Sequence, residues 1–222
     1  LWDRLFRATL PYGRKGVALQ ALSAIDLALW DLAGKAADKP VYQLLGGPVQ
    51  PDIPVYASAL HPVGADKVKA EAKAYVEEGY QAMKMRFPYG PGHGIEGMRA
   101  NEEHVANVRD AVGDDIEIMA DAYMGWDFLY AKKMVKRLEP YRLAWLEEAF
   151  LPDDLNSYAK LRQETSIPIS GGEHEYTRFG FQQIIEKQAM DIIQPDLRRC
   201  GGLSEGRRIL SLIHISEPTR RT

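Results

Sequence analysis

The sequence predicts an α/β protein whose strands run parallel to one another. Short apolar segments alternate with helical segments six times after residue 52. Such alternation is typical of parallel strands joined by right-handed helical crossovers. The composition fits a globular protein, because 45% of the 222 residues are hydrophobic and 27% are charged.

Residues 17–33 form the first predicted helix. Its apolar residues follow one another too closely for a helix with a single buried face, so we expect burial on most sides. Gly34 is the expected left-handed C-cap of this helix. Pro40 and the Gly-Gly-Pro run at 46–48 then interrupt the chain before the next regular segment.

The elements after residue 52 follow in a regular order. The predicted strands cover residues 53–57, 80–86, 116–120, 143–146, 167–170 and 190–194. The predicted helices cover residues 66–78, 99–112, 128–138, 155–163, 179–187 and 203–210. A doubly wound sheet and a closed barrel both fit this order, so the polar residues have to decide between them.

Three acidic residues come directly after three consecutive strands. Asp121, Glu147 and Glu173 are separated by 26 positions each time, which is one strand–helix unit. In a parallel barrel the carboxyl ends of the strands share one face, where the three carboxylates would converge. Such carboxylates repel one another unless a cation neutralises them, and oxygen ligands favour Mg²⁺, with Mn²⁺ as the alternative. Taken singly, each acid also fits a helix N-cap or a surface charge.

Three further residues belong to the same predicted face. Lys84 and Arg86 are two positions apart at the end of a strand, so both point to one side, where each can bind a substrate carboxylate. Asp196 ends the sixth predicted strand and is suited to orient a histidine from the next strand. Its alternative role is to cap the helix that follows Gly202.

Seven short segments have the order and spacing of a known enzyme family. They are SAIDLALWDLAGK (23–35), PVYQLLGG (40–47), KMRFP (84–88), DAYMGW (121–126), WLEEA (145–149), GGEHEYTR (171–178) and QPDLRRCGG (194–202). Together they resemble the mandelate racemase branch of the enolase superfamily, from near residue 11 to about residue 210. KMRFPYGPGHG and GGEHEYTR are most similar to the L-rhamnonate dehydratase group.

This resemblance implies a capping domain followed by a modified (β/α)₇β-barrel. Residues 1–47 are then the C-terminal helices of the α+β capping domain, and residues 48–210 are an incomplete TIM-like barrel of about six βα units. Residues 211–222 do not resemble the family and are interpreted as a foreign tail, such as translated adapter DNA. Because the first residue is Leu1 and not Met, we expect the chain to begin inside a longer protein.

The activity that the resemblance implies is that of a Mg²⁺-dependent acid-sugar dehydratase. Such an enzyme removes the proton α to a carboxylate and eliminates the β-hydroxyl, which gives a 2-keto-3-deoxy acid. The implied metal ligands are Asp121, Glu147 and Glu173. The implied base is a histidine on the strand after Asp196, which Asp196 would orient.

Lys84 and Arg86 match the family's strand with the pattern KxK or KxR, and both are candidate catalytic residues. A guanidinium stays protonated, so Arg86 argues against a racemase that needs two bases. Two other functions stay open: a racemase or cycloisomerase of the same superfamily, and an inactive truncated barrel that only binds metal.

Four more residues are candidates for proton transfer or substrate contact. His174 is a candidate acid or substrate contact, and its alternative role is to support the neighbouring ligand. His93 lies in a Gly/Pro-rich loop and is a candidate sugar contact, with an exposed loop histidine as the simpler interpretation. Tyr123 and Trp126 are candidate pocket residues, and simple packing explains them equally well.

The base itself is missing from its expected position. His214 follows Gly202 by 12 positions, whereas a crossover needs roughly 10–12 residues before any strand begins. His214 is therefore expected in or just after the sixth helix. We expect the 222-residue chain to have little or no dehydratase activity and to bind Mg²⁺ weakly.

Composition limits the partners. A small-molecule sugar acid is the expected substrate, and the family commonly forms homo-oligomers. The net charge of −3 argues against a nucleic-acid surface. No apolar run approaches the roughly 20 residues of a membrane span, so no membrane partner is expected. The single cysteine, Cys200, fits a reducing cytoplasm.

Overall fold

The computed structural model describes residues 1–216, with side chains described as far as residue 213. Residues 217–222 of the predicted foreign tail lie outside the described residues. The chain divides into two compact units. The sheet unit comprises Pro54–Gly171 and Lys187–Ile193, and the helical unit comprises Leu1–Ile53, Gly172–Glu186 and Gln194–Thr222.

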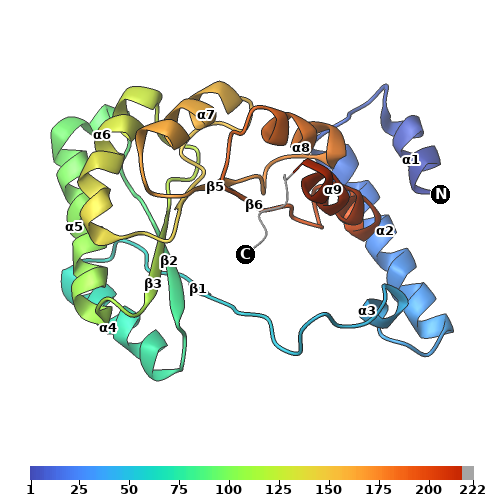
Figure 1. The fold of residues 1–222 in the computed structure, drawn as a ribbon, viewed down its shortest axis with the longest axis horizontal. Helices are drawn as coiled ribbons and strands as arrows, with labels where there is room; N and C mark the ends of the chain where they lie inside the picture. The colour runs from blue at the N-terminus through green and yellow to red at the C-terminus, as the bar shows by residue number, and fades with distance from the viewer. Residues whose placement is uncertain (217–222) are drawn as a thin grey trace. The chain divides into compact units, whose positions relative to one another are not determined.

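The sheet unit contains a parallel six-stranded sheet in the order β1-β2-β3-β4-β5-β6. Its strands are β1 (Ala57–Ser58), β2 (Ala82–Arg86), β3 (Glu117–Asp121), β4 (Leu146–Glu147), β5 (Ile169–Gly171) and β6 (Ile192–Ile193). Each strand pairs with the strand before it in the sequence, which is the order of a barrel wall and not of a doubly wound sheet. The predicted α/β class with six parallel strands is confirmed, and the described residues form part of a barrel (Figure 1).

Helices of the sheet unit connect these strands. They are α4 (Ala65–Glu77), α5 (Gly94–Val112), α6 (Phe128–Leu138) and α7 (Leu155–Glu164), with the 3₁₀ turns η1 (Pro91–His93) and η2 (Glu139–Tyr141). Neighbouring helices pack side by side along the strands (Figure 1). Local sequence sets their ends: the Asp127 carboxylate caps α6 by accepting the Tyr130 N–H at 2.8 Å, and Gly113, at φ 75°, ends α5.

The core of the sheet unit lies between the strands and these helices. Met83, Met85 and Ile118 are fully buried, as expected for parallel strands that are covered on both faces. Lys84 interrupts the apolar run of β2, yet it is only 6% exposed. A buried lysine needs a partner of opposite charge, and the acidic residues at the carboxyl ends of the strands can provide it.

Several element boundaries differ from the sequence prediction, among them those of β1 and α5. β1 pairs only at Ala57–Ser58 and not over 53–57, and Pro54 has no N–H to donate to a neighbouring strand. α5 begins at Gly94 and not at residue 99, since η1 leads directly into the helix. Gly97 is required there, because a Cβ at this position would lie 2.5 Å from the His93 Cβ.

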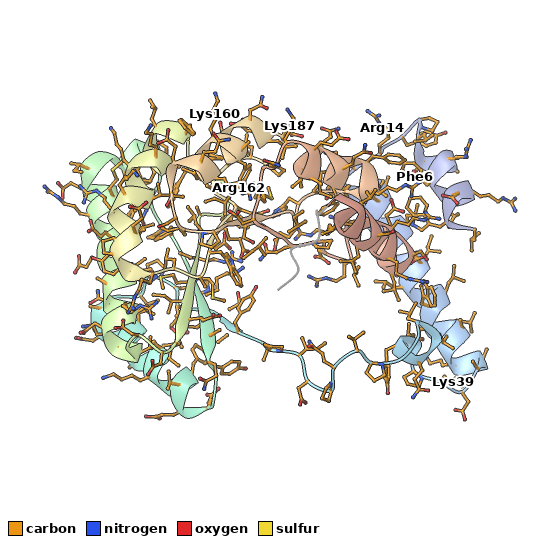
Figure 2. All side chains as sticks on the ribbon, in the orientation of Figure 1. Phe6, Arg14, Lys39, Lys160, Arg162 and Lys187 are labelled. Carbon is orange, nitrogen blue, oxygen red and sulfur yellow. The ribbon has the colours of Figure 1, made fainter. Side chains whose placement is uncertain are left out.

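Arg162, labelled in Figure 2, links α7 to the last two strands of the sheet. Its Nε donates to Asp191 Oδ1 at 2.5 Å, and its Nη1 donates to the Gln188 carbonyl at 3.1 Å. Asp191 Oδ2 accepts the Ile169 N–H at 2.9 Å. The Asp191 carboxylate therefore fixes the starts of β5 and β6 against α7.

The helical unit contains α1 (Trp2–Thr9), α2 (Val17–Ala36), α3 (Val41–Leu44), α8 (Thr177–Glu186) and α9 (Gly202–Ser216). Helix α2 packs on α1 and α9, and α8 packs on α9. Phe6, labelled in Figure 2, stacks on Trp2 and on Phe179, with ring centroids 5.1 and 6.1 Å apart. His214 belongs to α9, as its distance from Gly202 predicted.

Hydrogen bonds between distant parts of the sequence hold the helical unit together. Trp2 Nε1 donates to the Gly201 carbonyl at 2.6 Å. Ser23 Oγ accepts the Gly201 N–H at 3.0 Å. The Asp26 carboxylate accepts the Ser204 N–H at 2.9 Å. Asp26 of α2 therefore caps the first turn of α9.

Two predictions about α2 are wrong. The helix is not buried on most sides, since Val17 and Leu32 are 80% and 61% exposed, and its helical neighbours in the described chain cover one face. Gly34 is not a C-cap, because α2 continues to Ala36. A Cβ on Gly34 would lie 2.8 Å from the Lys39 carbonyl oxygen, so this glycine permits a close return of the chain.

Helix α2 also contradicts the expectation that no segment is long and apolar enough to cross a membrane. Its 20 residues have a mean hydropathy of 1.3 over an 18-residue window. Length and composition alone do not separate a membrane helix from a core helix of a globular protein. The buried side chains of Ser23 and Asp26 bind backbone groups at 201–204, as those of a packed helix do.

Candidate functional site

The strand ends of the sheet unit bring two of the predicted metal ligands side by side. Arg86 pairs in register with Asp121, and Asp121 pairs in register with Glu147. Side chains in register on neighbouring strands lie on the same face of a sheet. The Asp121 and Glu147 residues are 3% and 1% exposed, so both carboxylates are buried at this edge.

Lys84 and Arg86 supply positive charge beside these carboxylates. Lys84 Nζ forms an ion pair with Glu147 Oε1 and lies 3.9 Å from Asp121 Oδ2. Arg86 Nε lies 3.6 Å from the same Asp121 oxygen. The side chain of Lys84 is 7% exposed and that of Arg86 is 45% exposed, so Lys84 lies inside the cluster and Arg86 at its rim.

Burial and mutual repulsion govern the protonation of this cluster. Burial raises the pKa of Asp121 and the charge of Glu147 raises it further, against the opposing effects of the Tyr123 N–H, Lys84 and Arg86. Burial acts to lower the pKa of Lys84, but the hydrogen bond and the charge of Glu147 outweigh it, so the pKa of Lys84 is raised. Lys84 therefore stays an ammonium that balances two crowded carboxylates.

This set of donors fits a hard divalent cation. Two buried carboxylates on neighbouring strand ends present the oxygen ligands that Mg²⁺ and Mn²⁺ prefer. Burial and the charge of Glu147 both raise the pKa of Asp121, and a cation would relieve the repulsion between the two carboxylates. Asp121 and Glu147 are thus suited to hold the ion, and Glu173, which follows the end of β5 by two residues, is the third predicted ligand.

The loops after β3 and β4 adopt left-handed backbone conformations. Tyr123, Met124 and Glu148 have φ angles of 46°, 61° and 43°. The Asp121 carboxylate accepts the Tyr123 N–H at 2.8 Å, and the Met124 N–H donates to the Glu148 carbonyl at 2.6 Å. Non-glycine residues in this region cost roughly 1–3 kcal/mol each and gather at functional sites, which agrees with the position of the carboxylates.

The sequence alone did not indicate Trp145 and Tyr56 as parts of the cluster. Trp145 Nε1 donates to Glu147 Oε2 at 2.9 Å, and the Tyr56 ring meets the Trp145 ring edge-on at 5.6 Å. Trp145 precedes Glu147 by two positions, and this spacing on one strand face was the available signal. Tyr56 had no comparable signal, because its position depends on the pairing of β1 with β2.

The predicted substrate contacts have different surroundings. Tyr123 is 52% exposed and lies against Arg86, whose Cζ is 5.0 Å from the ring centroid. Trp126 is 6% exposed and donates its indole N–H to the Tyr89 carbonyl at 2.9 Å, which favours a packing role. His93 is exposed in η1, with its ring 5.0 Å from that of Tyr89. Of the three, Tyr123 contacts the charged cluster directly.

Glu173, His174 and Asp196 lie in the helical unit, where Arg199 links the two acids. Arg199 Nη1 is 3.6 Å from Glu173 Oε1, and Arg199 Nε is 3.5 Å from Asp196 Oδ2. His174 Nε2 is 3.8 Å from Glu173 Oε1. Burial acts to raise the pKa of Asp196, but hydrogen bonds from Arg198 and the charges of Arg198 and Arg199 outweigh it and lower the pKa.

Arg199 was also not singled out from the sequence. The available signal was the pair of arginines at 198 and 199, directly after the predicted functional acid Asp196. The alternative role of Asp196 as a helix cap is wrong, because Asp26 occupies that role at α9.

A parallel sheet in barrel order, with buried acids at its carboxyl-terminal edge, is the arrangement of the α/β-barrel enzymes. Residues 67–215 match the family described as Enolase C-terminal domain-like. Residues 1–46 match the Mandelate racemase / muconate lactonizing enzyme, N-terminal domain. The chain belongs to the enolase superfamily, in its mandelate racemase and muconate lactonizing enzyme branch, and the resemblance of the seven segments is confirmed.

Three similar proteins show the range of activities among its relatives. The L-rhamnonate dehydratase of Saccharopolyspora erythraea is 44% identical over 96% of this chain and 52% of its own length. The 3,6-anhydro-D-galactonate cycloisomerase of Zobellia galactanivorans is 35% identical, with a TM-score of 0.90 over 97% of this chain and 59% of that structure. The rhamnonate dehydratase of Gibberella zeae complexed with Mg is 36% identical, with a TM-score of 0.85 over 96% of this chain and 50% of that structure.

The chain spans about half the length of the curated dehydratase that it matches, 52%. It is nevertheless related to that enzyme over nearly all of its own residues. The named relatives include dehydratases and a cycloisomerase, and the Gibberella zeae dehydratase structure contains Mg.

Proposed function

We propose that the protein is a Mg²⁺-dependent acid-sugar dehydratase that acts on an L-rhamnonate-like acid. The observation that carries this proposal is the pair of buried carboxylates, Asp121 and Glu147, beside Lys84 and Arg86 at the carboxyl ends of β2, β3 and β4. The 44% identity to an L-rhamnonate dehydratase supports the substrate class.

The residues of the cluster divide into two roles. Asp121 and Glu147 would hold Mg²⁺, which supplies Lewis-acid stabilisation of the enediolate when it is bound, and Glu173 is the third ligand that the resemblance implies. Lys84 and Arg86 carry the positive charge that can bind the carboxylate of the acid sugar. Arg86 is well placed for a first encounter because its side chain is 45% exposed.

The reaction needs one base and one acid. The α C–H bond breaks and its proton passes to the base, which the resemblance implies to be a histidine oriented by Asp196. The β C–O bond then breaks, and the hydroxyl leaves as water with a proton from an acid, for which His174 is the candidate. The resulting enol tautomerises to the 2-keto-3-deoxy acid. His214 is the histidine that follows Asp196 in the sequence, and it belongs to α9 and not to a strand, so it does not stand at the position that the resemblance implies for the base.

Calorimetric titration with Mg²⁺, paired with an assay for the 2-keto-3-deoxy acid, tests this proposal. We expect Mg²⁺ binding by the unaltered chain, and a loss of binding of about 10-fold or more in Glu147→Gln, which removes a ligand charge. Glu117→Gln is the matched control, because Glu117 is an exposed glutamate at the start of β3. Absence of Mg²⁺ binding by the unaltered chain, or equal affinities in both variants, would overturn the proposed metal site.

A racemase or cycloisomerase of the same superfamily is the second candidate, and the cycloisomerase structure with a TM-score of 0.90 favours it. Such an enzyme would exchange the α proton with solvent deuterium and release no keto-deoxy product. Elimination of water without accumulation of an exchanged substrate would exclude it. Mg²⁺ binding with neither exchange nor product would favour the third reading, an inactive truncated barrel that only binds metal.

A further inference from the structure

We propose that Trp145 is a positioning residue that orients the Glu147 carboxylate for the divalent cation. This inference rests on the metal site of the proposed function. Trp145 directly precedes β4, and it stands two positions before Glu147. Alternate residues of an extended segment share a face, so the indole and the carboxylate lie on the same side of the sheet.

The two oxygens of Glu147 are bound by donors from different segments of the chain. Oε2 accepts the Trp145 indole N–H at 2.9 Å, and Oε1 forms the ion pair with Lys84 of β2. Two donors on two oxygens fix the plane of a carboxylate, which one donor alone leaves free to rotate. A metal ligand depends on such outer partners for its orientation.

The indole is itself held in place. The Tyr56 ring meets Trp145 edge-on, with an interplanar angle of 79°. Lys84 Nζ lies 5.6 Å from the centroid of the Tyr56 ring, within the range of a cation–π contact. The contacts therefore form a closed cycle that includes the carboxylate and runs through Tyr56, Trp145, Glu147 and Lys84.

The chemistry of the indole limits its role to positioning. Its Nε1–H donates a hydrogen bond and accepts none, so Trp145 cannot ligate a metal. It is also neutral, and unlike Lys84 it does not compete with a cation for the negative charge of Glu147. Trp145 can therefore keep its hydrogen bond to one oxygen while the other oxygen serves the ion.

The test uses the full 222-residue chain, with Mg²⁺ as the probe. Trp145→Phe keeps an aromatic ring and removes the N–H donor. Trp30→Phe is the matched control, because Trp30 Nε1 donates to Ser204 Oγ at 3.0 Å in the helical unit. The first readout is the Mg²⁺ dissociation constant by calorimetry. The second is the set of indole N–H resonances of the four tryptophans in a ¹⁵N-labelled sample.

We expect Trp145→Phe to raise the Mg²⁺ dissociation constant about 10-fold, and Trp30→Phe to leave it unchanged. In the unaltered chain, the Trp145 resonance should shift on addition of Mg²⁺, since its acceptor oxygen belongs to a ligand. That shift does not depend on whether Trp145→Phe folds. Mg²⁺ binding with a stationary Trp145 resonance, or an unchanged constant in folded Trp145→Phe, would overturn this inference and leave the metal site standing. Absence of Mg²⁺ binding by the unaltered chain would overturn both.

Discussion

Lys84 is the residue on which the stability of the charged cluster depends. It is 6% exposed and lies between Asp121 and Glu147, which are 3% and 1% exposed. Lys84→Met would remove the buried cation that lies beside both carboxylates, so we expect the free energy of unfolding to fall by about 3–5 kcal/mol. Urea unfolding in the presence of EDTA measures this loss, and added Mg²⁺ should restore part of it.

Lys132→Met provides the comparison for this prediction. Its ion pair with Glu164 joins side chains that are 45% and 36% exposed, and pairs this exposed contribute little. The control should therefore unfold close to the unaltered chain. A similar loss of unfolding free energy in both variants would contradict the prediction that the buried Lys84 matters more than an exposed lysine.

His104 makes the stability of the protein depend on pH. Its Nε2 lies 3.1 Å from the Leu60 carbonyl oxygen, and burial lowers its pKa below the ordinary value of 6.5. The unfolded chain therefore takes up a proton more readily than the folded chain. This contribution to stability is present above pH 6.5 and is lost as the pH falls through the folded pKa.

The variant that tests this effect is His104→Gln, which keeps an N–H donor for Leu60. We expect its free energy of unfolding to change less than that of the unaltered chain between about pH 7 and pH 5, in parallel urea titrations. If the free energy of unfolding had the same slope against pH in both proteins, the protonation of His104 would not differ between the folded and the unfolded chain.

At the scale of elements, α2 shows packing acting against helix propensity. Alanine in a helix interior is ordinarily more stable than glycine by about 1 kcal/mol. At Gly34, however, a Cβ would lie 2.8 Å from the Lys39 carbonyl oxygen, and the Lys39 N–H bonds the Gly34 carbonyl at 2.9 Å. We expect Gly34→Ala to lower the midpoint of thermal unfolding, measured by circular dichroism.

Leu32→Ala, at a position of α2 that is 61% exposed, serves as the control for Gly34→Ala and should change the midpoint little. If Gly34→Ala raised the midpoint, the turn at Lys39 would have to move aside for the new methyl group. The sign of the change therefore distinguishes a rigid turn from a yielding one.

The bounds of elements that end at a local sequence signal were predictable. The bounds of elements that depend on pairing with another strand were less predictable. α6 covers Phe128–Leu138 as predicted, since the Asp127 cap and the Pro-containing turn η2 define its ends locally. β4 and β6 have two residues each, against predicted strands of four and five residues. A strand is as long as its pairing, and the pairing depends on neighbours that are remote in sequence.

At the scale of the whole molecule, the repeat of one βα unit made the barrel order predictable. Equal spacing pointed to Asp121 and Glu147, which the structure brings together on adjacent strands. Trp145, Tyr56 and Arg199 were not predictable in the same way. Each reaches its partner through the direction and length of a side chain, which a spacing rule does not contain.

The long-range hydrogen bonds of the helical unit have a consequence for synthesis of the chain. Trp2, Ser23 and Asp26 bond backbone groups at 201–204, across 199, 178 and 178 positions of sequence. A ribosome releases α2 early, yet its capping contacts with α9 form only when residue 204 has emerged. Neighbouring strands of the sheet can pair with segments made shortly before. During translation, the faces of α1 and α2 that contact residues 201–204 thus wait longer for their partner than the strands do, and a nascent-chain chaperone would meet them.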